Sequence, residues 1–394
     1  MNSKLIDISK NKALKFIILL GIVSLFADIT YEGARSINGQ YLAMLGASAT
    51  VVGIIAGFGE LIGYALRLVS GYLTDKTKKY WTITFIGYVV NLLAVPLLAL
   101  AGHWQIAAIF IIIERFGKSI RTPARDLMLS HATSKIGHGW GFGLHEALDQ
   151  IGAVSGPLMV ALVLYFKGNY QNCFSLLIVP ALLALITLFV AKVTYPNPRD
   201  FEIEEVKLEN KTFSKTFWLY ILAISLVAAG YADFALIAFH FKKVSIISEN
   251  WIPAFYAIAM CTDAISALFF GRLFDKIGIV TLVIAILLSC LFAPFVFLGN
   301  FYFALIGMVL WGIGMGAQES IMKAAISNMV NMNNRGFAYG IFNTAYGIFW
   351  FIGSALMGIL YDISVLYIVF FSVIIQLASI PLLLLAKRKL LHNG

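Results

Sequence analysis

The stretch Gly71-Tyr72-Leu73-Thr74-Asp75-Lys76 is one half of a repeat that organises the whole chain. The same glycine, aspartate and lysine return with the same spacing in Gly271-Arg-Leu-Phe-Asp275-Lys276. A second pair of segments behaves in the same way, since Gly139-Trp-Gly-Phe-Gly143 is matched by Gly336-Phe-Ala-Tyr-Gly340. Two similar pairs in the same order predict that the chain consists of two halves built on one plan.

The composition places both halves in a membrane. Of the 394 residues, 60% are hydrophobic and only 12% are charged, and the mean hydropathy is +0.87. A soluble protein of this length would need a far more polar exterior. We therefore predict an all-α polytopic membrane protein with twelve spans of about 20 apolar residues. The spans are expected near residues 14–43, 49–72, 80–101, 105–129, 139–166, 172–194, 216–241, 251–273, 278–299, 301–328, 336–361 and 364–386.

The charges of the connections predict the orientation. Lysine and arginine gather in every second connection, so the net charge of +9 follows the positive-inside rule and does not indicate nucleic-acid binding. Both termini of this multi-pass cell-membrane protein should therefore lie in the cytoplasm. The longest connection has mixed charge and two prolines, as solvated linkers do. We expect a monomer with an N-terminal six-helix bundle (1–194), a cytoplasmic linker (195–215) and a C-terminal six-helix bundle (216–394).

The fourth span contains an unusually charged stretch, Glu114-Arg-Phe-Gly-Lys-Ser-Ile-Arg-Thr-Pro-Ala-Arg-Asp126. At about 1.5 Å per residue, this stretch climbs roughly 18 Å along a helix, more than half of a bilayer core. Ionisable groups at such depth are costly, and they usually serve a function or pair inside a bundle. Permanent pairing with acids of the first or fifth span is the alternative to function. The cavity group is expected to comprise Glu114, Arg115 and Lys118, and the cytoplasmic gate Arg121, Arg125 and Asp75.

Acidic residues that could pair with these bases lie in the first and fifth spans. Asp28, Glu32 and Arg35 share one face of the first span, and Glu146 and Asp149 are one turn apart in the fifth. A buried carboxylate can take up and release a proton as its surroundings alternate. Glu32, Glu146 and Asp149 are therefore candidate proton carriers, unless they pair permanently with span-four bases. The other candidates for substrate or proton coupling are Glu60, Asp233 and Asp263.

The repeated loop resembles the cytoplasmic signature of the major facilitator superfamily. Both copies of Gly-x3-Asp-Lys stand where that family carries it, after spans two and eight, and Arg115-x2-Lys118-Ser119 stands where relatives carry Arg-x2-Gln-Gly. Gly143-x8-Gly152-x3-Gly156-Pro157 is similar to a pattern associated with the family's antiporters. The resemblance implies two pseudo-symmetric six-helix bundles that alternate access to a site between them. It also implies a cytoplasmic gate at Gly71, Asp75, Lys76, Gly271, Asp275 and Lys276, and helix packing or bending at Gly143, Gly152, Gly156 and Pro157.

These features predict a secondary active transporter of a small organic solute and not an enzyme. Proton-coupled export of a drug or metabolite is favoured, mainly because of the span-five pattern. The alternatives are proton-coupled import of a polar or zwitterionic nutrient, and a non-transporting membrane sensor or scaffold. Gly117-Lys118-Ser119 ends like a phosphate-binding loop, but that motif needs a glycine where Ile112 stands. We expect no ATP, metal or cofactor, and the partners expected are the solute, protons and the lipid bilayer.

Overall fold

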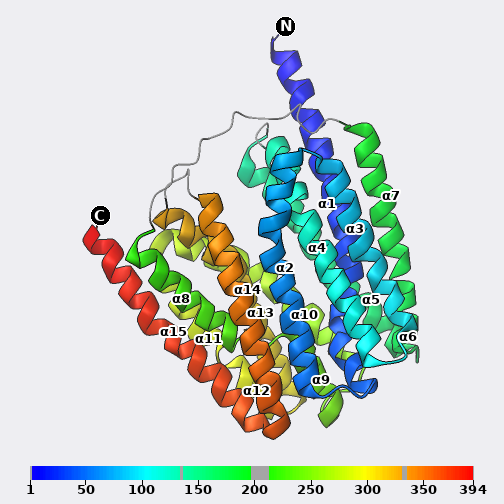
Figure 1. The fold of residues 1–394 in the computed structure, drawn as a ribbon, viewed down its shortest axis with the longest axis vertical. Helices are drawn as coiled ribbons and strands as arrows, with labels where there is room; N and C mark the ends of the chain where they lie inside the picture. The colour runs from blue at the N-terminus through cyan, green and yellow to red at the C-terminus, as the bar shows by residue number, and fades with distance from the viewer. Residues whose placement is uncertain (1, 134–135, 197–212, 331–334, 394) are drawn as a thin grey trace. The chain divides into compact units, whose positions relative to one another are not determined.

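The computed structural model describes the chain except residues 1, 134–135, 197–212, 331–334 and 394. Most of the predicted linker, residues 197–212, therefore lies outside the described residues. Those residues that are described form helices joined by short turns (Figure 1). The helices are α1 (Asn2–Met44), α2 (Ala49–Thr77), α3 (Tyr80–Leu97), the 3₁₀ turn η1 (Leu98–Leu100), α4 (Trp104–Thr133), α5 (His138–Tyr165), α6 (Tyr170–Leu176), α7 (Ile178–Thr194), α8 (Lys215–Gly230), α9 (Phe234–Val244), α10 (Trp251–Ile277), α11 (Val280–Ser289), α12 (Phe292–Leu298), α13 (Phe301–Met329), α14 (Arg335–Ile363) and α15 (Val365–Asn393).

The prediction of an all-α polytopic membrane fold is confirmed. Each predicted span coincides with one long helix or with two short consecutive helices. Eleven of these segments are long and apolar enough to cross a bilayer. The remaining span is α4, whose 30 residues are long enough to cross but include the charged stretch.

Two spans are interrupted by proline. Pro180 is the third residue of α7, and Pro294 is the third residue of α12. A proline ring clashes with the carbonyl group four residues earlier, which belongs to Leu176 and to Cys290 respectively. The preceding helices α6 and α11 end at Leu176 and Ser289, so each break lies where the ring would clash.

A third interruption, at Tyr231–Asp233, separates α8 from α9. The Asp233 carboxylate caps α9 by accepting a hydrogen bond of 2.9 Å from the Ala235 backbone N–H. On the other side of the break, the Gly230 carbonyl accepts hydrogen bonds from Ser372 Oγ (2.6 Å) and Gln376 Nε2 (3.1 Å) of α15. Polar side chains thus satisfy backbone groups that the interrupted helix leaves open, as a membrane interior requires.

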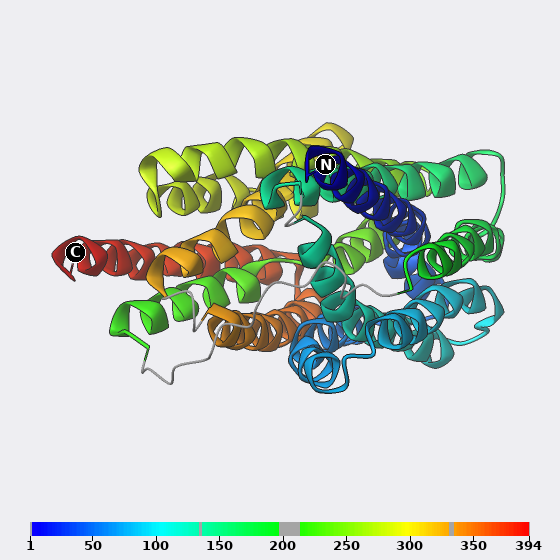
Figure 2. The same cartoon turned by 90° about the horizontal axis from the view of Figure 1, so that it is seen from above.

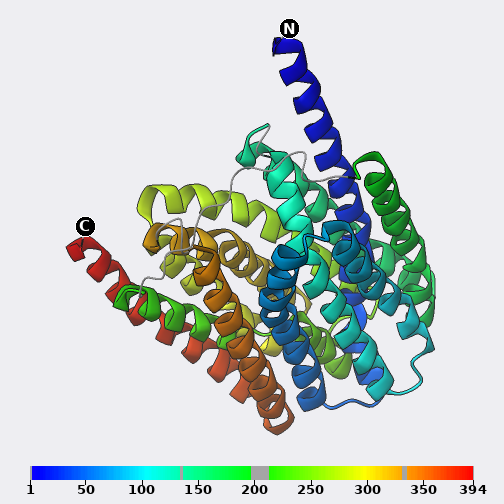
Figure 3. The same ribbon diagram turned by 45° about the horizontal axis from the view of Figure 1, so that its top comes forward.

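The helices form two compact units. The first comprises Met1–Arg35 and Leu66–Glu205, and the second comprises Ser36–Ala65 and Val206–Gly394. In the first unit, α3 packs against both α4 and α7 (Figure 1, Figure 2). In the second unit, α13 packs against α10, α11 and α12, while α8 packs along α14 and α15 (Figure 3).

Residues 36–65, from the end of α1 and the start of α2, belong to the second unit. Close backbone contacts hold this hairpin there. Gly39 lies against the Ala235 carbonyl of α9, and a β-carbon at Gly358 of α14 would lie 2.9 Å from Thr50 Cα. The division of the sequence into six-helix halves at residues 194 and 216 stays a prediction.

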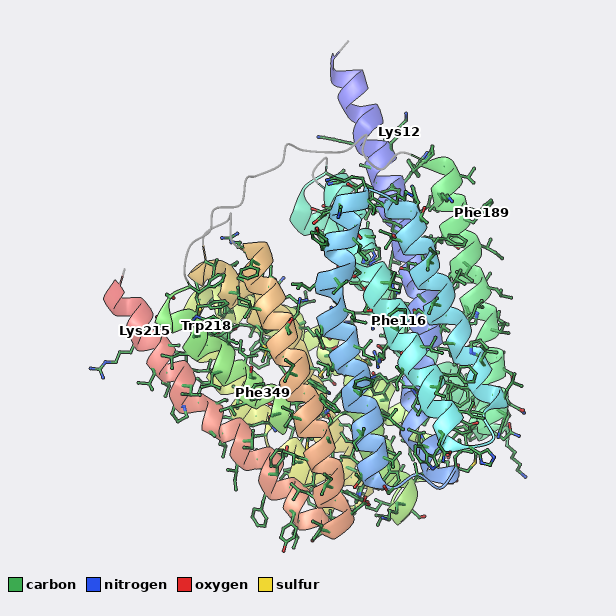
Figure 4. The ribbon with its side chains drawn as sticks, in the orientation of Figure 1. Lys12, Phe116, Phe189, Lys215, Trp218 and Phe349 are labelled. Carbon is green, nitrogen blue, oxygen red and sulfur yellow. The ribbon has the colours of Figure 1, made fainter. Side chains whose placement is uncertain are left out.

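Large apolar side chains cover the outer surfaces of the helices (Figure 4). Phe116 of α4 is 44% exposed, Phe189 of α7 is 56% exposed and Trp218 of α8 is 51% exposed. A soluble protein rarely exposes so many large apolar groups. In a bilayer these side chains contact lipid chains.

Candidate functional site

The first unit buries a group of ionisable side chains contributed by α1 and α4. Asp28, Tyr31 and Glu32 of α1 are 6%, 7% and 7% exposed. The Tyr31 hydroxyl lies close to the Asp28 carboxylate. Glu32 Oε1 lies 4.0 Å from Arg35 Nη1 on its own helix and 4.0 Å from Lys118 Nζ on α4. We refer to Asp28, Tyr31, Glu32 and Lys118 as the α1–α4 cluster.

Tyr31 is the centre of this cluster. Lys118 Nζ lies 3.9 Å from the centroid of the Tyr31 ring, a cation–π contact worth about 0.5–2 kcal/mol depending on hydration. Arg121 approaches the same ring at 5.6 Å. One aromatic side chain therefore has an acid close to its hydroxyl and a base against its ring.

Asp28 is incompletely paired. Among the described residues, its Oδ1 atom has no hydrogen-bond partner although it is buried. An ionised carboxylate is costly in a dehydrated site unless both of its oxygens are paired or hydrated. The α1–α4 cluster thus contains a buried acid with an unsatisfied oxygen and a half-buried base, Lys118.

Two glycines of α5 bring that helix onto α1 beside the cluster. A β-carbon at Gly152 would lie 2.8 Å from Asp28 Cβ and would also meet the Leu25 carbonyl. A β-carbon at Gly156 would lie 2.9 Å from the Gly33 nitrogen. Any side chain larger than hydrogen would separate the two helices at the level of Asp28.

A second polar group lies one helical turn from Asp28 toward the N-terminus of α1. Ser24 Oγ lies 3.1 Å from His145 Nε2 of α5 and accepts a hydrogen bond of 3.1 Å from Arg125 Nη1 of α4. His145 Nδ1 lies 3.7 Å from Asp149 Oδ2, and Arg125 Nη2 lies 2.8 Å from Asp126 Oδ1. We refer to these five residues as the Ser24 network, which joins α1, α4 and α5.

Glu114 and Arg115 form a separate pair that is held by α3. Asn91 Nδ2 donates to Glu114 Oε1 at 2.7 Å and to the Glu114 carbonyl at 3.0 Å. Glu114 Oε2 lies 3.3 Å from Arg115 Nε. The close approach depends on Gly117, where a β-carbon would lie 2.7 Å from Asn91 Cα. Glu114 is thus bound to α3, whereas Lys118 contacts α1.

The predicted gate residues are distributed over different contacts. Arg121 is 1% exposed and its guanidinium lies 4.2 Å from the centroid of the Tyr88 ring of α3. Arg125 belongs to the Ser24 network. Asp75 is exposed near the end of α2, and the described part of the chain offers it no hydrogen bond or ion pair. The end of α2 nevertheless lies beside α4, since a β-carbon at Gly71 would be 3.7 Å from Pro123 Cβ.

The other predicted residues lie apart from the α1–α4 cluster or in the second unit. Glu146 is exposed, with Gln150 Nε2 3.5 Å from its Oε1 atom. Helix α5 continues through Pro157, and Gly143 has no atom of the described residues within 4 Å of its β-carbon position. In the second unit, Glu60 and Asp263 are 8% and 2% exposed, and Asp233 caps α9. Gly271, Asp275 and Lys276 lie near the end of α10, where Asp275 and Lys276 are exposed. Lys76 is exposed near the end of α2. The described residues contain no group of three histidine, cysteine, aspartate or glutamate side chains that could hold a metal ion.

Sequence reasoning missed the neutral residues that connect the charges, namely Tyr31, Ser24, Tyr88 and Asn91. Tyr31 stands between Asp28 and Glu32, on the face that those acids define, which is a signal available in the sequence. Tyr88 and Asn91 lie on a different helix from the groups that they contact, so only the packing of α3 on α4 identifies them.

Comparisons with known proteins agree with this architecture. Residues 18–354 match the Major Facilitator Superfamily, and residues 243–392 match it again. The chain belongs to this family of membrane transporters. It is 39% identical over 378 residues to an uncharacterized protein of Mycobacterium tuberculosis, covering 94% of this chain and 92% of the relative. An uncharacterized MFS-type transporter of Methanocaldococcus jannaschii is 29% identical over 372 residues, covering 91% and 90%.

Solved structures show the same fold at low identity. The nucleoside transporter NupG has a TM-score of 0.72 at 13% identity, covering 95% of this chain and 98% of its own. A bacterial homologue of the iron transporter ferroportin, in an inward-facing state, has a TM-score of 0.66 at 15% identity, covering 95% and 98%. Because proteins with such different cargoes share one fold, the fold alone does not identify the substrate of this chain.

Proposed function

We propose that this transporter couples the movement of a small organic solute to protons, with Asp28 as the proton-carrying carboxylate. The observation that carries the proposal is the buried Asp28 carboxylate, which lies close to the Tyr31 hydroxyl and has an Oδ1 atom without a partner among the described residues. Burial disfavours the ionised form of a carboxyl group, and a nearby cation favours it. A change in hydration, or in the distance to Lys118, therefore changes the proton affinity of Asp28.

Lys118 provides the second element of the mechanism. Its ammonium group lies 4.0 Å from Glu32 and against the Tyr31 ring, so its charge is shared within the cluster. When Asp28 loses its proton, Lys118 stabilises the new negative charge. When Asp28 is protonated, its negative charge is lost and Lys118 pairs with Glu32 alone. The net charge of the cluster within the membrane is then smaller in size than when Asp28 is ionised. Alternating access then exposes the two protonation states to opposite sides of the membrane.

Export is the direction we favour. Two glycines of the pattern that resembles antiporters, Gly152 and Gly156, bring α5 directly against α1, and Gly152 faces Asp28. Asp28, the proposed proton carrier, therefore lies at the contact between α1 and α5 that these glycines form. Import of a polar or zwitterionic nutrient is the second candidate, favoured by the mixed charges of Glu32, Arg35 and Lys118.

We further infer two six-helix bundles joined by a cytoplasmic linker, and a monomer with both termini in the cytoplasm. The basic connections, such as Lys76–Lys79 and Arg272–Lys276, support this orientation. A reporter enzyme that is active only in the cytoplasm should be active when it is fused after Gly394. Activity of a fused reporter that works only outside the cell would show that the orientation is the opposite one.

The test is solute flux in proteoliposomes under an imposed pH gradient. Candidate solutes are first selected from a metabolite and drug library by thermal stabilisation of the purified protein, because a bound ligand stabilises the folded state. Proton-coupled transport predicts that the pH gradient drives accumulation of the selected solute. Flux that ignores the gradient would contradict proton coupling, and the absence of any flux would favour a sensor or scaffold.

A further inference from the structure

The second unit contains a continuous array of aromatic rings. Tyr64 of α2 contacts Tyr346 of α14 with ring centroids 5.2 Å apart, and Tyr346 contacts Trp350 at 5.5 Å. Trp350 contacts Tyr231 at 5.9 Å, and Tyr231 contacts Trp311 of α13 at 5.7 Å. The array therefore runs from α2 through α14 to the interruption between α8 and α9.

The approach of α2 to α14 depends on a glycine. A β-carbon at Gly57 would lie 2.8 Å from Ser354 Cβ and 3.0 Å from Phe351 Cα. Because α2 lies so close to α14, the side chains one and two turns further along α2, Glu60 and Tyr64, reach the level of Tyr346.

Carboxylates lie near two hydroxyl groups of this array. Glu60 and Glu319 lie within electrostatic range of the Tyr346 hydroxyl, and Asp263 and Glu319 lie within range of the Tyr231 hydroxyl. Aromatic faces carry negative potential, and their attraction for a cation increases where water is excluded. An array of rings with neighbouring carboxylates attracts a positively charged ligand and repels an anion.

Two polar atoms of α14 in this region have no partner among the described residues. They are Nε1 of Trp350, a residue only 2% exposed, and Oδ1 of Asn343. The neighbouring Tyr346 hydroxyl, by contrast, donates to Gln318 Oε1 at 2.7 Å. A buried polar atom without a partner costs about 1–3 kcal/mol, so native proteins usually provide one. A ligand with one acceptor for the indole N–H and one donor for the amide oxygen would satisfy both atoms.

Access to the array is indicated by Glu319. It is exposed, while the adjacent Gln318 is 7% exposed and faces Tyr346. A carboxylate far inside a span faces a bundle interior or a water-filled space in preference to lipid. Lys323, also exposed, stands one turn beyond Glu319 on the same helix. The carboxylate therefore marks a hydrated route to Tyr346.

We propose that the second unit binds an organic cation, an amine that also carries a hydrogen-bond acceptor. The binding residues are Glu60, Tyr64, Glu319, Asn343, Tyr346 and Trp350. The ammonium group lies against the Tyr346 and Trp350 rings near Glu60 and donates to Asn343 Oδ1, while the acceptor of the ligand receives the Trp350 N–H. This inference rests on the proposed function and deepens it, because it names the class of solute that is carried.

The experiment is equilibrium calorimetry on the purified full-length protein in lipid nanodiscs, with three probes of one shape and different charge. Tyramine is the cation, tyrosol is the neutral analogue and 4-hydroxyphenylacetate is the anion. We expect tyramine to bind at least about tenfold more tightly than tyrosol, and the anion not to bind. Absence of tyramine binding at about 10 mM, or equal binding of the three probes, would overturn the proposal.

Variants locate the site. Glu60→Gln and Trp350→Phe keep the size or the aromatic character of the side chain, and each should weaken tyramine binding about tenfold. Glu249→Gln is the matched control, since Glu249 is an acid of the same unit that pairs with Lys242 at the surface. Tyramine binding that is unchanged in Glu60→Gln and Trp350→Phe would place the cation elsewhere and contradict the proposal. Because no pH gradient is used, this result is independent of whether Asp28 couples transport to protons.

Discussion

The contact between α1 and α5 allows a quantitative prediction from a single methyl group. Gly152→Ala places a β-carbon 2.8 Å from Asp28 Cβ and against the Leu25 carbonyl, whereas ordinary contacts begin near 3.4 Å. The two helices must therefore separate by more than half an ångström. Overpacking of this kind costs about 1–3 kcal/mol, while alanine regains about 0.5–1 kcal/mol of helix propensity. Because the overpacking cost exceeds the gain in helix propensity, the variant should be destabilised.

The assay is the rate of irreversible thermal unfolding in detergent, because a large membrane protein rarely unfolds reversibly. A net loss of about 1–2 kcal/mol corresponds to roughly 5- to 30-fold faster unfolding when the contact is broken in the rate-limiting step. Gly143→Ala is the matched control on the same helix, since no described atom lies within 4 Å of its β-carbon position. It should unfold at the wild-type rate or more slowly. Equal rates for the two alanine variants would refute the proposed close contact between α1 and α5.

Three further substitutions test other parts of the structure. Asp233→Ala removes the cap of α9, which should lower the stability measured by thermal unfolding by about 1 kcal/mol without abolishing solute flux. Loss of solute flux with unchanged stability would instead make Asp233 a coupling residue. The Asp362 carboxylate caps the start of α2 by accepting hydrogen bonds of 2.8 Å from Thr50 N and 2.7 Å from Thr50 Oγ1. Asp362→Asn weakens these bonds, so hydrogen exchange at the Thr50 amide should become faster. Unchanged protection of this amide would contradict the capping role. Tyr88→Leu removes the ring beneath the buried Arg121 guanidinium and should destabilise the protein by about 2 kcal/mol or more; a wild-type melting temperature would argue against the stacking contact.

The helical spans could be predicted from the sequence because the bilayer imposes a length and a polarity on every span. Even α4, which fails a purely apolar criterion, could be placed by its length and by the apolar run before Glu114. The interruptions at Pro180 and Pro294 could not be predicted from proline alone, since α5 continues through Pro157. A run of apolar residues conceals such breaks when only hydropathy is considered.

The candidate site was less predictable because it depends on which helices pack together. The sequence places the ionisable residues Asp28, Glu32 and Lys118 within membrane spans, but the contact between Glu32 and Lys118 depends on the close approach of helices distant in sequence. Glu114 carries the same charge as Glu32 and lies one turn from Lys118, yet it binds Asn91 of α3. Periodicity identifies the face of a helix but not the neighbour that the face meets.

The most direct test of the proposed function is proton movement during solute transport, measured with a pH-sensitive dye inside proteoliposomes. We predict that Asp28→Asn abolishes solute-driven proton flux while solute exchange without a gradient continues, because asparagine keeps the size of the side chain but cannot release a proton. Asp28→Glu, which keeps the carboxyl group, should restore part of the proton flux. Solute-driven proton flux at the wild-type level in Asp28→Asn would contradict the assignment of Asp28 as the proton carrier.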